Sequence, residues 1–303
     1  MYLHENRELF EELINAASDY MGVNRETIEK DYYVTILLKK LAETEKLPCV
    51  FKGGTSLSKC YNCIDRFSED IDITFTEHLG EARRKKLKYK VLKPIVDELG
   101  LSIRNWDSIE SNKDYNAYYI AYQPISDYAD EAIRPEVKLE TALVSYAFPT
   151  EIKSVGNILY DYLMQDNMEL IEEFGLAPFD MRVQSLSRTF IDKIFALCDY
   201  YMQGKSKRYS RHMYDLYKLF PLITVDDELK WLVTEVRQHR STLSICPSAM
   251  PDVNIYEKIM GFCDDDFYKE DYNTVTKYFI SETIPYETII NNMKEIANIL
   301  FYT

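Results

Sequence analysis

The sequence lacks the segments that direct a protein into or across a membrane. No apolar run approaches the roughly 18 residues that a membrane-spanning helix needs. The first residues, MYLHENRELFEELINAA, are charged and patterned like a helix, without the apolar core of a signal peptide. We therefore expect a cytoplasmic protein with no membrane partner.

Cysteine and histidine are also scarce, with six cysteines and four histidines in 303 residues. Cys60 and Cys63 form a C-x-x-C pair, which supplies half of the ligands of a typical zinc site. The sequence has no second C-x-x-C and no H-x-x-H to supply the other half. We therefore expect reduced thiols and a packed helix end here, with a metal or redox role as the alternative.

Positive charge is in short supply, because 50 acidic residues outnumber 36 Lys and Arg and give a net charge of −14. This balance argues against a protein that coats nucleic acid duplexes, whose affinity comes mostly from phosphate contacts. Two basic stretches, 83–93 and 205–211, are local exceptions. Each is either a solvated helix face or part of a basic groove.

Periodicity divides the chain into a mixed half and a helical half. Helical patterns cover residues 6–20, 24–43 and 80–99, and short strand patterns occur near 48–52, 69–75, 101–110, 116–125 and 135–144. From about residue 151 the patterns are mostly helical, most clearly in 185–203 and 210–223. The sequence thus predicts an α+β fold, with a mixed-sheet domain over 1–150 and a helical domain over 151–303.

Glycine is rare, yet Gly53 and Gly54 are adjacent at the end of the strand pattern PCVF. A helix is expected to follow, starting at Thr55, a residue type that favours the N-cap. A strand that ends in glycines before a helix exposes backbone N–H groups and can cradle a phosphate. The same pair also suits an ordinary tight turn, so it is weak evidence alone.

Two carboxylates interrupt the next strand pattern, EDIDITF. Asp70 and Asp72 are two residues apart, so they project from the same face, while Ile71 and Ile73 point to the other. Paired carboxylates suit a hard cation such as Mg²⁺, although a solvent-facing acidic strand gives the same pattern. A third carboxylate is expected from a neighbouring strand. Glu140 fits best, with Glu136 as its rival, and either also suits a structural salt bridge.

Two charged positions stand out in the helical half. Lys193 lies among apolar neighbours in FIDKIFALC, and its ammonium either snorkels to solvent or reaches inward toward triphosphate oxygens. Arg211 and Asp215 are spaced i, i+4, a spacing that also predicts a simple helix ion pair.

Together, KGGTSLSKCY and RFSEDIDI resemble the first two motifs of the AbiEii/AbiGii toxin family, within the DNA polymerase β-like nucleotidyltransferase superfamily. IEKDYYVTILLKKL resembles the family's N-terminal helix, and SLSRTFIDKIFALCDYY and RHMYDLYKL resemble its two C-terminal motifs. The resemblance covers residues 10–222, and residues 223–303 match nothing.

The resemblance implies roles for individual residues. It implies Mg²⁺ ligands in Asp70 and Asp72, with Glu140 as a third carboxylate placed by pattern, and catalytic roles for Lys193 and Asp215 contributed by the helical domain. Mn²⁺ is the alternative metal. The nucleotide-binding positions implied are Lys52, Gly53, Gly54, Thr55, Arg66, Ser68 and Arg211.

The implied function is that of a toxin from a toxin–antitoxin or abortive-infection system, which serves in phage defence. Such an enzyme transfers a nucleotide from an NTP to RNA, with the tRNA 3′ end as the favoured acceptor, and its antitoxin is encoded by a neighbouring gene. Two alternatives stay open: transfer to a protein or small-molecule acceptor, and NTP binding without turnover through a partner.

Overall fold

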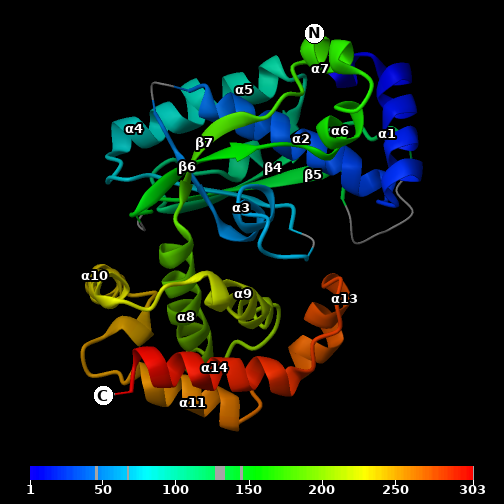
Figure 1. The fold of residues 1–303 in the computed structure, drawn as a ribbon. Helices are drawn as coiled ribbons and strands as arrows, with labels where there is room; N and C mark the ends of the chain where they lie inside the picture. The colour runs from blue at the N-terminus through cyan, green and yellow to red at the C-terminus, as the bar shows by residue number, and fades with distance from the viewer. Residues whose placement is uncertain (45–46, 67, 127–133, 144–145, 303) are drawn as a thin grey trace. The chain divides into compact units, whose positions relative to one another are not determined.

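The protein is described from a computed structural model that covers residues 1–44, 47–66, 68–126, 134–143 and 146–302. The chain forms two compact units, one of Met1–Tyr61 with Ser68–Gln184 and one of Asn62–Phe67 with Ser185–Thr303. Figure 1 shows a sheet with helices in the first unit and helices alone in the second. No helix in the described ranges is long and apolar enough to span a membrane. The α+β fold class is therefore confirmed.

The first unit is built on a seven-stranded mixed sheet of order β3-β4-β5-β2-β1-β7-β6. β2 runs parallel to β5 and β1 parallel to β7, whereas the other neighbours are antiparallel. The strands are β1 (Val50–Lys52), β2 (Ile71–Thr74), β3 (Ser102–Ile103), β4 (Tyr115–Ala121), β5 (Glu136–Ala142), β6 (Thr150–Val155) and β7 (Phe179–Gln184).

The last two strands move the boundary of the sheet domain. β6 begins at Thr150, and almost all of β6 and β7 lies in the part of the chain that was expected to be helical, yet β7 pairs with β1 through Phe51 and Val183. The division of the chain therefore lies at residue 184. Sequence periodicity missed these strands because polar residues alternate with only two buried apolar ones, Met181 and Val183, in β7.

Helices of the first unit follow the sequence patterns closely. The expected N-terminal pair is confirmed, and α2 packs against β5 and β7. The basic pattern over 80–99 becomes α4, a π-helical turn over Leu87–Leu92, and α5. The helices are α1 (Arg7–Met21), α2 (Arg25–Ala42), α3 (Gly53–Lys59), α4 (Glu81–Lys86), α5 (Lys93–Glu98), α6 (Ile158–Leu163) and α7 (Met168–Phe174).

One expected helix start is wrong. α3 begins at Gly53, two residues before Thr55, and Lys52 occupies the N-cap position with an extended backbone and no side-chain cap. Thr55 cannot cap the helix from inside it, and its hydroxyl is instead 2.9 Å from that of Ser68. The glycine pair is therefore the first turn of the helix itself.

The second unit is a helical bundle in which α8 packs against α9 and α11, and α14 packs against α9 and α11. Residues 223–303, which had no expected role, supply most of it. The helices are α8 (Leu186–Met202), α9 (Arg211–Leu219), α10 (Asp227–Ser241), α11 (Ile255–Asp264), α12 (Lys269–Asp271), α13 (Lys277–Phe279) and α14 (Tyr286–Leu300).

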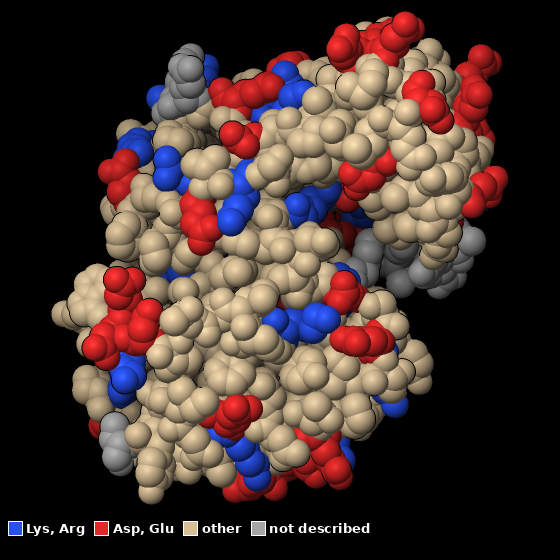
Figure 2. Space-filling model, viewed as in Figure 1, with Lys and Arg blue, Asp and Glu red and all other residues tan. Residues whose placement is uncertain are grey.

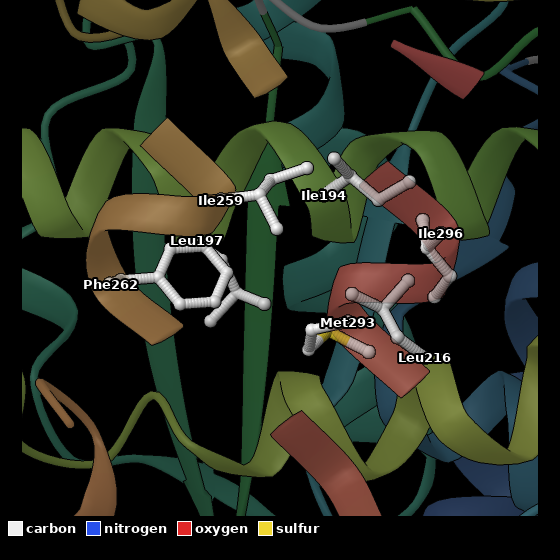
Figure 3. Close-up of a pocket in the computed structure, with 7 residues that line it drawn as sticks. All are labelled: Ile194, Leu197, Leu216, Ile259, Phe262, Met293 and Ile296. Carbon is white, nitrogen blue, oxygen red and sulfur yellow. The ribbon is translucent and has the colours of Figure 1, made fainter. Parts of the chain in front are cut away.

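Apolar side chains from four helices converge in the core of this bundle (Figure 3). The gap between them leaves no room for a water molecule, so it is a packing gap and not a ligand site. The lining residues are Ile194, Leu197, Leu216, Ile259, Phe262, Met293 and Ile296.

Two isoleucine substitutions test which strand faces carry the core. Ile73 in β2 is fully buried, so Ile73→Ala is expected to lower the free energy of unfolding by about 2–5 kcal/mol. Ile152 in the edge strand β6 is 55% exposed, so Ile152→Ala removes the same atoms with little effect. Urea denaturation of both variants measures the difference, and equal losses would contradict this placement of the core.

Candidate functional site

Gly53 provides space for a carboxylate. Its φ is +81°, in the left-handed region that favours glycine, and a Cβ atom added here would lie 2.0 Å from Oδ2 of Asp72. No side chain fits in that position without displacing Asp72. The scarce glycine at the start of α3 therefore allows the helix to begin directly against the carboxylate of the neighbouring strand.

Three ionisable side chains form a row across the centre of the sheet. Lys52 of β1 is in register with Asp72 of β2, and Asp72 is in register with Glu140 of β5. Ile71 and Ile73 are fully buried on the other face of β2, as the alternation predicts. The sheet register thus joins a cation and two carboxylates that are far apart in the sequence.

The register favours Glu140 over its rival. Glu136 is opposite Ala121 at the other end of β5 and forms an ion pair of 2.8 Å with Arg104. Glu140 instead shares a hydrogen bond with Asp72, in which the Asp72 carboxyl donates. Glu140 is therefore the third carboxylate beside the DID strand.

The electrostatics of this pair are asymmetric. Burial raises the pKa of Asp72, and the adjacent charges of Glu140 and Asp70 raise it further, while Lys52 acts against them. Burial acts the same way on Glu140, but hydrogen bonds from Asp72, Lys138 and Tyr115 outweigh it and lower the pKa of Glu140. One proton shared between two crowded carboxyls is the expected result.

These oxygens fit a hard divalent cation by their chemistry, since a cation between the carboxylates would relieve the repulsion that raises the pKa of Asp72. In the described parts of the chain, however, no group of three or more His, Cys, Asp or Glu side chains is arranged to hold a metal ion. The arrangement shown is thus the hydrogen-bonded pair, with Asp70 one residue before β2.

Two partners of Glu140 escaped the sequence reasoning. The Tyr115 hydroxyl donates to Glu140 Oε1 at 2.5 Å, and Lys138 forms an ion pair with the same atom. Lys138 is two residues before Glu140 on the same strand face, which the alternation of β5 could have indicated. Tyr115 comes from β4, and only the observed register, which pairs it with Ala142, brings it close.

Charged residues of α2 brace the segments on either side of the row. Lys30 is 3% exposed and forms an ion pair with Glu69, the residue before Asp70. Asp31 pairs with Lys59, the last residue of α3, at 2.6 Å, and also accepts from the backbone N–H of Ile158. The IEKD motif of this helix thus supports both the glycine corner and the DID strand.

The helical unit contains a separate charged cluster. Asp215 of α9 is fully buried and accepts hydrogen bonds from Arg66 Nε at 2.6 Å, Arg66 Nη2 at 2.8 Å and Lys193 Nζ at 2.7 Å. Burial alone would raise the pKa of Asp215, but the charges of Arg66 and Lys193 hold it well below its usual range. Asp215 is therefore ionised and fully committed to these two cations.

Lys193 does not snorkel to solvent, because it is 6% exposed and turns inward to Asp215. Burial lowers the pKa of Lys193 against the opposing effect of Asp215. His212 lies 3.4 Å from Lys193 through Nδ1, and burial, with Lys193 and Arg211 close by, lowers the pKa of His212 well below its ordinary value. A neutral His212 is thus an acceptor for Lys193, which the sequence did not suggest.

Arg211 behaves differently from the i, i+4 expectation. Its side chain is exposed, and within the described residues it forms no ion pair with Asp215, whose oxygens are taken by Arg66 and Lys193. Arg66 comes from the short segment 62–67 that belongs to the helical unit. Of the expected site residues, this unit holds Arg66, Lys193, Arg211 and Asp215, and the sheet unit holds Lys52, Gly53, Gly54, Thr55, Ser68, Asp70, Asp72 and Glu140.

Among the described residues, Cys60 and Cys63 of the C-x-x-C pair form no disulfide. Burial raises the pKa of Cys60 to about 12 and that of Cys63 to about 11. Thiols with raised pKa values are poor nucleophiles and poor zinc ligands at neutral pH. This environment favours the packing role expected for the pair.

The model of the AbiEii family, described as nucleotidyl transferase AbiEii toxin of type IV toxin–antitoxin systems, matches residues 36–292. The chain belongs to this family. It is accordingly a nucleotidyltransferase of the toxin type, as the resemblance predicted. The match continues through α11 and into α14, so the part beyond residue 222 that seemed unrelated belongs to the family as well.

Two solved structures are similar to this chain. MenT4, a nucleotidyltransferase toxin from Mycobacterium tuberculosis, matches with a TM-score of 0.61 and 15% identity over 95% of this chain and 89% of that one. JHP933 from Helicobacter pylori gives a TM-score of 0.46 and 16% identity over 92% and 93% of the two chains. Comparison with curated proteins found no match. The MenT4 likeness shows that this AbiEii-family chain has the fold of a nucleotidyltransferase toxin.

Two glycine-to-alanine changes test the close approach at Asp72. Gly53→Ala is expected to displace Asp72 and to reduce nucleotidyl transfer at least about 100-fold, because a misplaced reacting group costs that much. Gly100 has a similar φ of +65° but open space around it, so Gly100→Ala introduces the same backbone strain without the clash. If the two variants retain equal transfer activity, the steric interpretation fails.

The buried cluster predicts a pH-dependent contribution to stability. The pKa of folded Asp215 lies below that of an unfolded carboxyl near about 4, so its contribution is present at neutral pH and is lost as pH falls below about 5. Asp215→Asn is expected to lower the free energy of unfolding by about 3–5 kcal/mol at pH 7, because two buried cations lose their partner. The difference in the free energy of unfolding between Asp215→Asn and the parent should decrease toward pH 3.

Denaturation midpoints at pH 7, 5 and 3 measure this effect. Asp227→Asn is the control, since Asp227 is exposed at the start of α10 and should leave stability unchanged at each pH. A stability difference between Asp215→Asn and the parent that stays constant from pH 7 to pH 3 would contradict an ionised Asp215.

Proposed function

We propose that this AbiEii-family enzyme transfers a nucleotide from an NTP to RNA in a Mg²⁺-dependent reaction, with the tRNA 3′ end as acceptor. The observation that supports it most is the row of Lys52, Asp72 and Glu140, which begins at the glycine corner. As in other toxin–antitoxin systems, a cognate antitoxin from a neighbouring gene would oppose it in the cell.

Asp72 and Glu140, with Asp70 beside them, are the residues that would hold Mg²⁺, and Mn²⁺ suits the same oxygens. A bound divalent cation supplies charge neutralisation of the triphosphate and lowers the pKa of the attacking hydroxyl. Placing these carboxylates on adjacent strands fixes their separation before any ligand binds. Such preorganisation is the main contribution of a protein to nucleotidyl transfer.

Lys52 is suited to the triphosphate. Its ammonium has no carboxylate within ion-pair distance among the described residues, although its backbone is in register with Asp72. It also holds the N-cap position of α3, where the backbone N–H groups of Gly53 and Gly54 are not used by a capping side chain. A cation at the glycine corner favours binding of phosphate oxygens.

The reaction joins the acceptor hydroxyl oxygen to the α-phosphorus and breaks the bond to the β-phosphate, so pyrophosphate leaves. In this proposal the hydroxyl proton passes to Glu140, whose strand β5 lies in register with Asp72 of β2. Nucleotide handling by Arg66, Lys193, Arg211 and Asp215 stays a prediction. The only support from the structure is that Asp215 accepts hydrogen bonds from two buried basic side chains, Arg66 and Lys193.

The test is incubation of purified protein with Mg²⁺, each α-³²P-labelled NTP and total tRNA. Asp72→Asn is expected to reduce label on tRNA at least about 100-fold. Asp252→Asn, which removes an exposed carboxylate elsewhere, should transfer like the parent, and EDTA should abolish transfer. Label on the protein or on a small molecule would replace tRNA as acceptor, and nucleotide binding without transfer would favour a role through a partner.

A further inference from the structure

The two basic stretches differ sharply in how their charges are used. In the first, 83–93, most cations are already paired or buried: Arg83 with Glu77, Arg84 with Asp114, Lys85 with Glu81, Lys93 with Asp97, and Lys88 with the carbonyl of Ile109. This stretch is largely structural. Its cations pair within 77–97 or contact residues 109–114.

The second stretch, the basic loop 205–211, carries exposed cations without acidic partners. Lys205, Lys207, Arg208 and Arg211 are all exposed. None has a carboxylate within ion-pair distance among the described residues, and Lys205 bonds only to the Gln203 amide oxygen at 2.7 Å. In a chain of net charge −14, four cations within seven residues repel one another without compensation, which predicts an anionic ligand.

The backbone of the basic loop is held rigidly. Asp271, which is 6% exposed, accepts from the N–H of Arg208 at 2.6 Å, the N–H of Ser210 at 3.0 Å and the Ser210 hydroxyl at 2.6 Å. Arg208 itself has a φ of +71°. These three hydrogen bonds to the buried Asp271 carboxylate hold the backbone of the basic loop in place, while the cationic side chains of the loop remain exposed. This is the arrangement of a preformed binding surface.

Planar rings accompany these cations. Tyr200 and Tyr209, both half-buried, stack with ring centroids 3.5 Å apart. Proteins that bind single-stranded RNA combine cations along the phosphates with aromatic rings for the bases. An acidic protein partner would need the cations alone, so the rings favour RNA.

On the face seen in Figure 2, Lys and Arg side chains lie among Asp and Glu and do not form one broad basic patch. With the net charge of −14, most of the protein repels polyanions. A local site is therefore required for an RNA ligand.

We propose that the basic loop 205–211 of the helical unit binds the phosphates of a single-stranded RNA end, the acceptor of the transfer reaction. The proposal rests on the proposed function for the identity of its ligand. It also assigns different roles to the two basic stretches, of which only the second binds RNA.

Two triple variants with the same change in net charge test this role. The loop triple is Lys205→Gln/Lys207→Gln/Arg208→Gln, and the control triple is Arg83→Gln/Lys85→Gln/Lys93→Gln, which removes ion-paired cations. Binding of a fluorescein-labelled single-stranded oligoribonucleotide is followed by anisotropy in EDTA without NTP, over a range of salt concentrations. Thermal midpoints verify that both triples are folded.

The loop triple is expected to raise the Kd at least about 10-fold and to reduce the slope of log Kd against log salt by about 2, since each lost contact to a single strand contributes about 0.7. The control triple should bind within about twofold of the parent. Equal weakening in both triples, or none in either, would overturn the proposal. Binding of labelled poly-glutamate is measured in the same way. If the loop triple loses poly-glutamate binding but retains RNA binding, the proposal is overturned in favour of a protein partner.

RNA binding and nucleotidyl transfer are measured separately, so each proposal can fail without the other. Asp72→Asn should bind the oligoribonucleotide like the parent, because the loop is intact. RNA binding that depends on the loop, without label transfer to tRNA, would refute the RNA transfer reaction and keep the RNA surface. Transfer to tRNA with an unchanged KM for tRNA in the loop triple would refute the surface and keep the reaction.

Discussion

The contact between the Gly53 backbone and the Asp72 carboxylate is the constraint on which the sheet unit depends. A Cβ atom there would lie 2.0 Å from Oδ2, so the sequence must have glycine where α3 starts. With this approach permitted, β1 pairs with β2, Lys52 takes its place opposite Asp72, and the parallel partner β5 delivers Glu140. Burial and the adjacent charges of Glu140 and Asp70 then raise the pKa of Asp72. The site is thus a product of strand register more than of any single motif.

Local patterns in the sequence were enough to predict much of this site. The alternation in DID placed Asp72 opposite two buried isoleucines, and the EVKLE pattern indicated Glu140. Tyr115 could not be predicted in the same way, because its contact with Glu140 depends on the register between β4 and β5. Lys30 and Asp31 were hidden for a related reason: a buried ion pair between a helix and a distant segment leaves no periodic trace in either.

The fold was predictable where one segment carries its own signal. The amphipathic helices α1 and α2 and the glycine-to-strand region were recognisable from their spacing. β6 and β7 were not, since each has polar residues at most alternate positions and gains its place by pairing with β1 or with the other. Arg66 was recognised as a basic position beside the motif, but its ion pair could not be predicted, because its partner Asp215 is 149 positions away in the sequence. Non-local pairing is what single-segment patterns do not contain.

The segment 62–67 has a consequence for how the chain reaches its native state. It belongs to the helical unit although residues on both sides of it belong to the sheet unit. During synthesis Arg66 emerges long before Asp215. Arg66 therefore has no carboxylate partner until α9 has been made. A fragment that begins at residue 185 would contain every helix of the bundle and still lack Arg66. The helices of this unit are therefore contiguous in the sequence, but the buried Asp215 lacks one of its two cationic partners unless residues 62–67 are present as well.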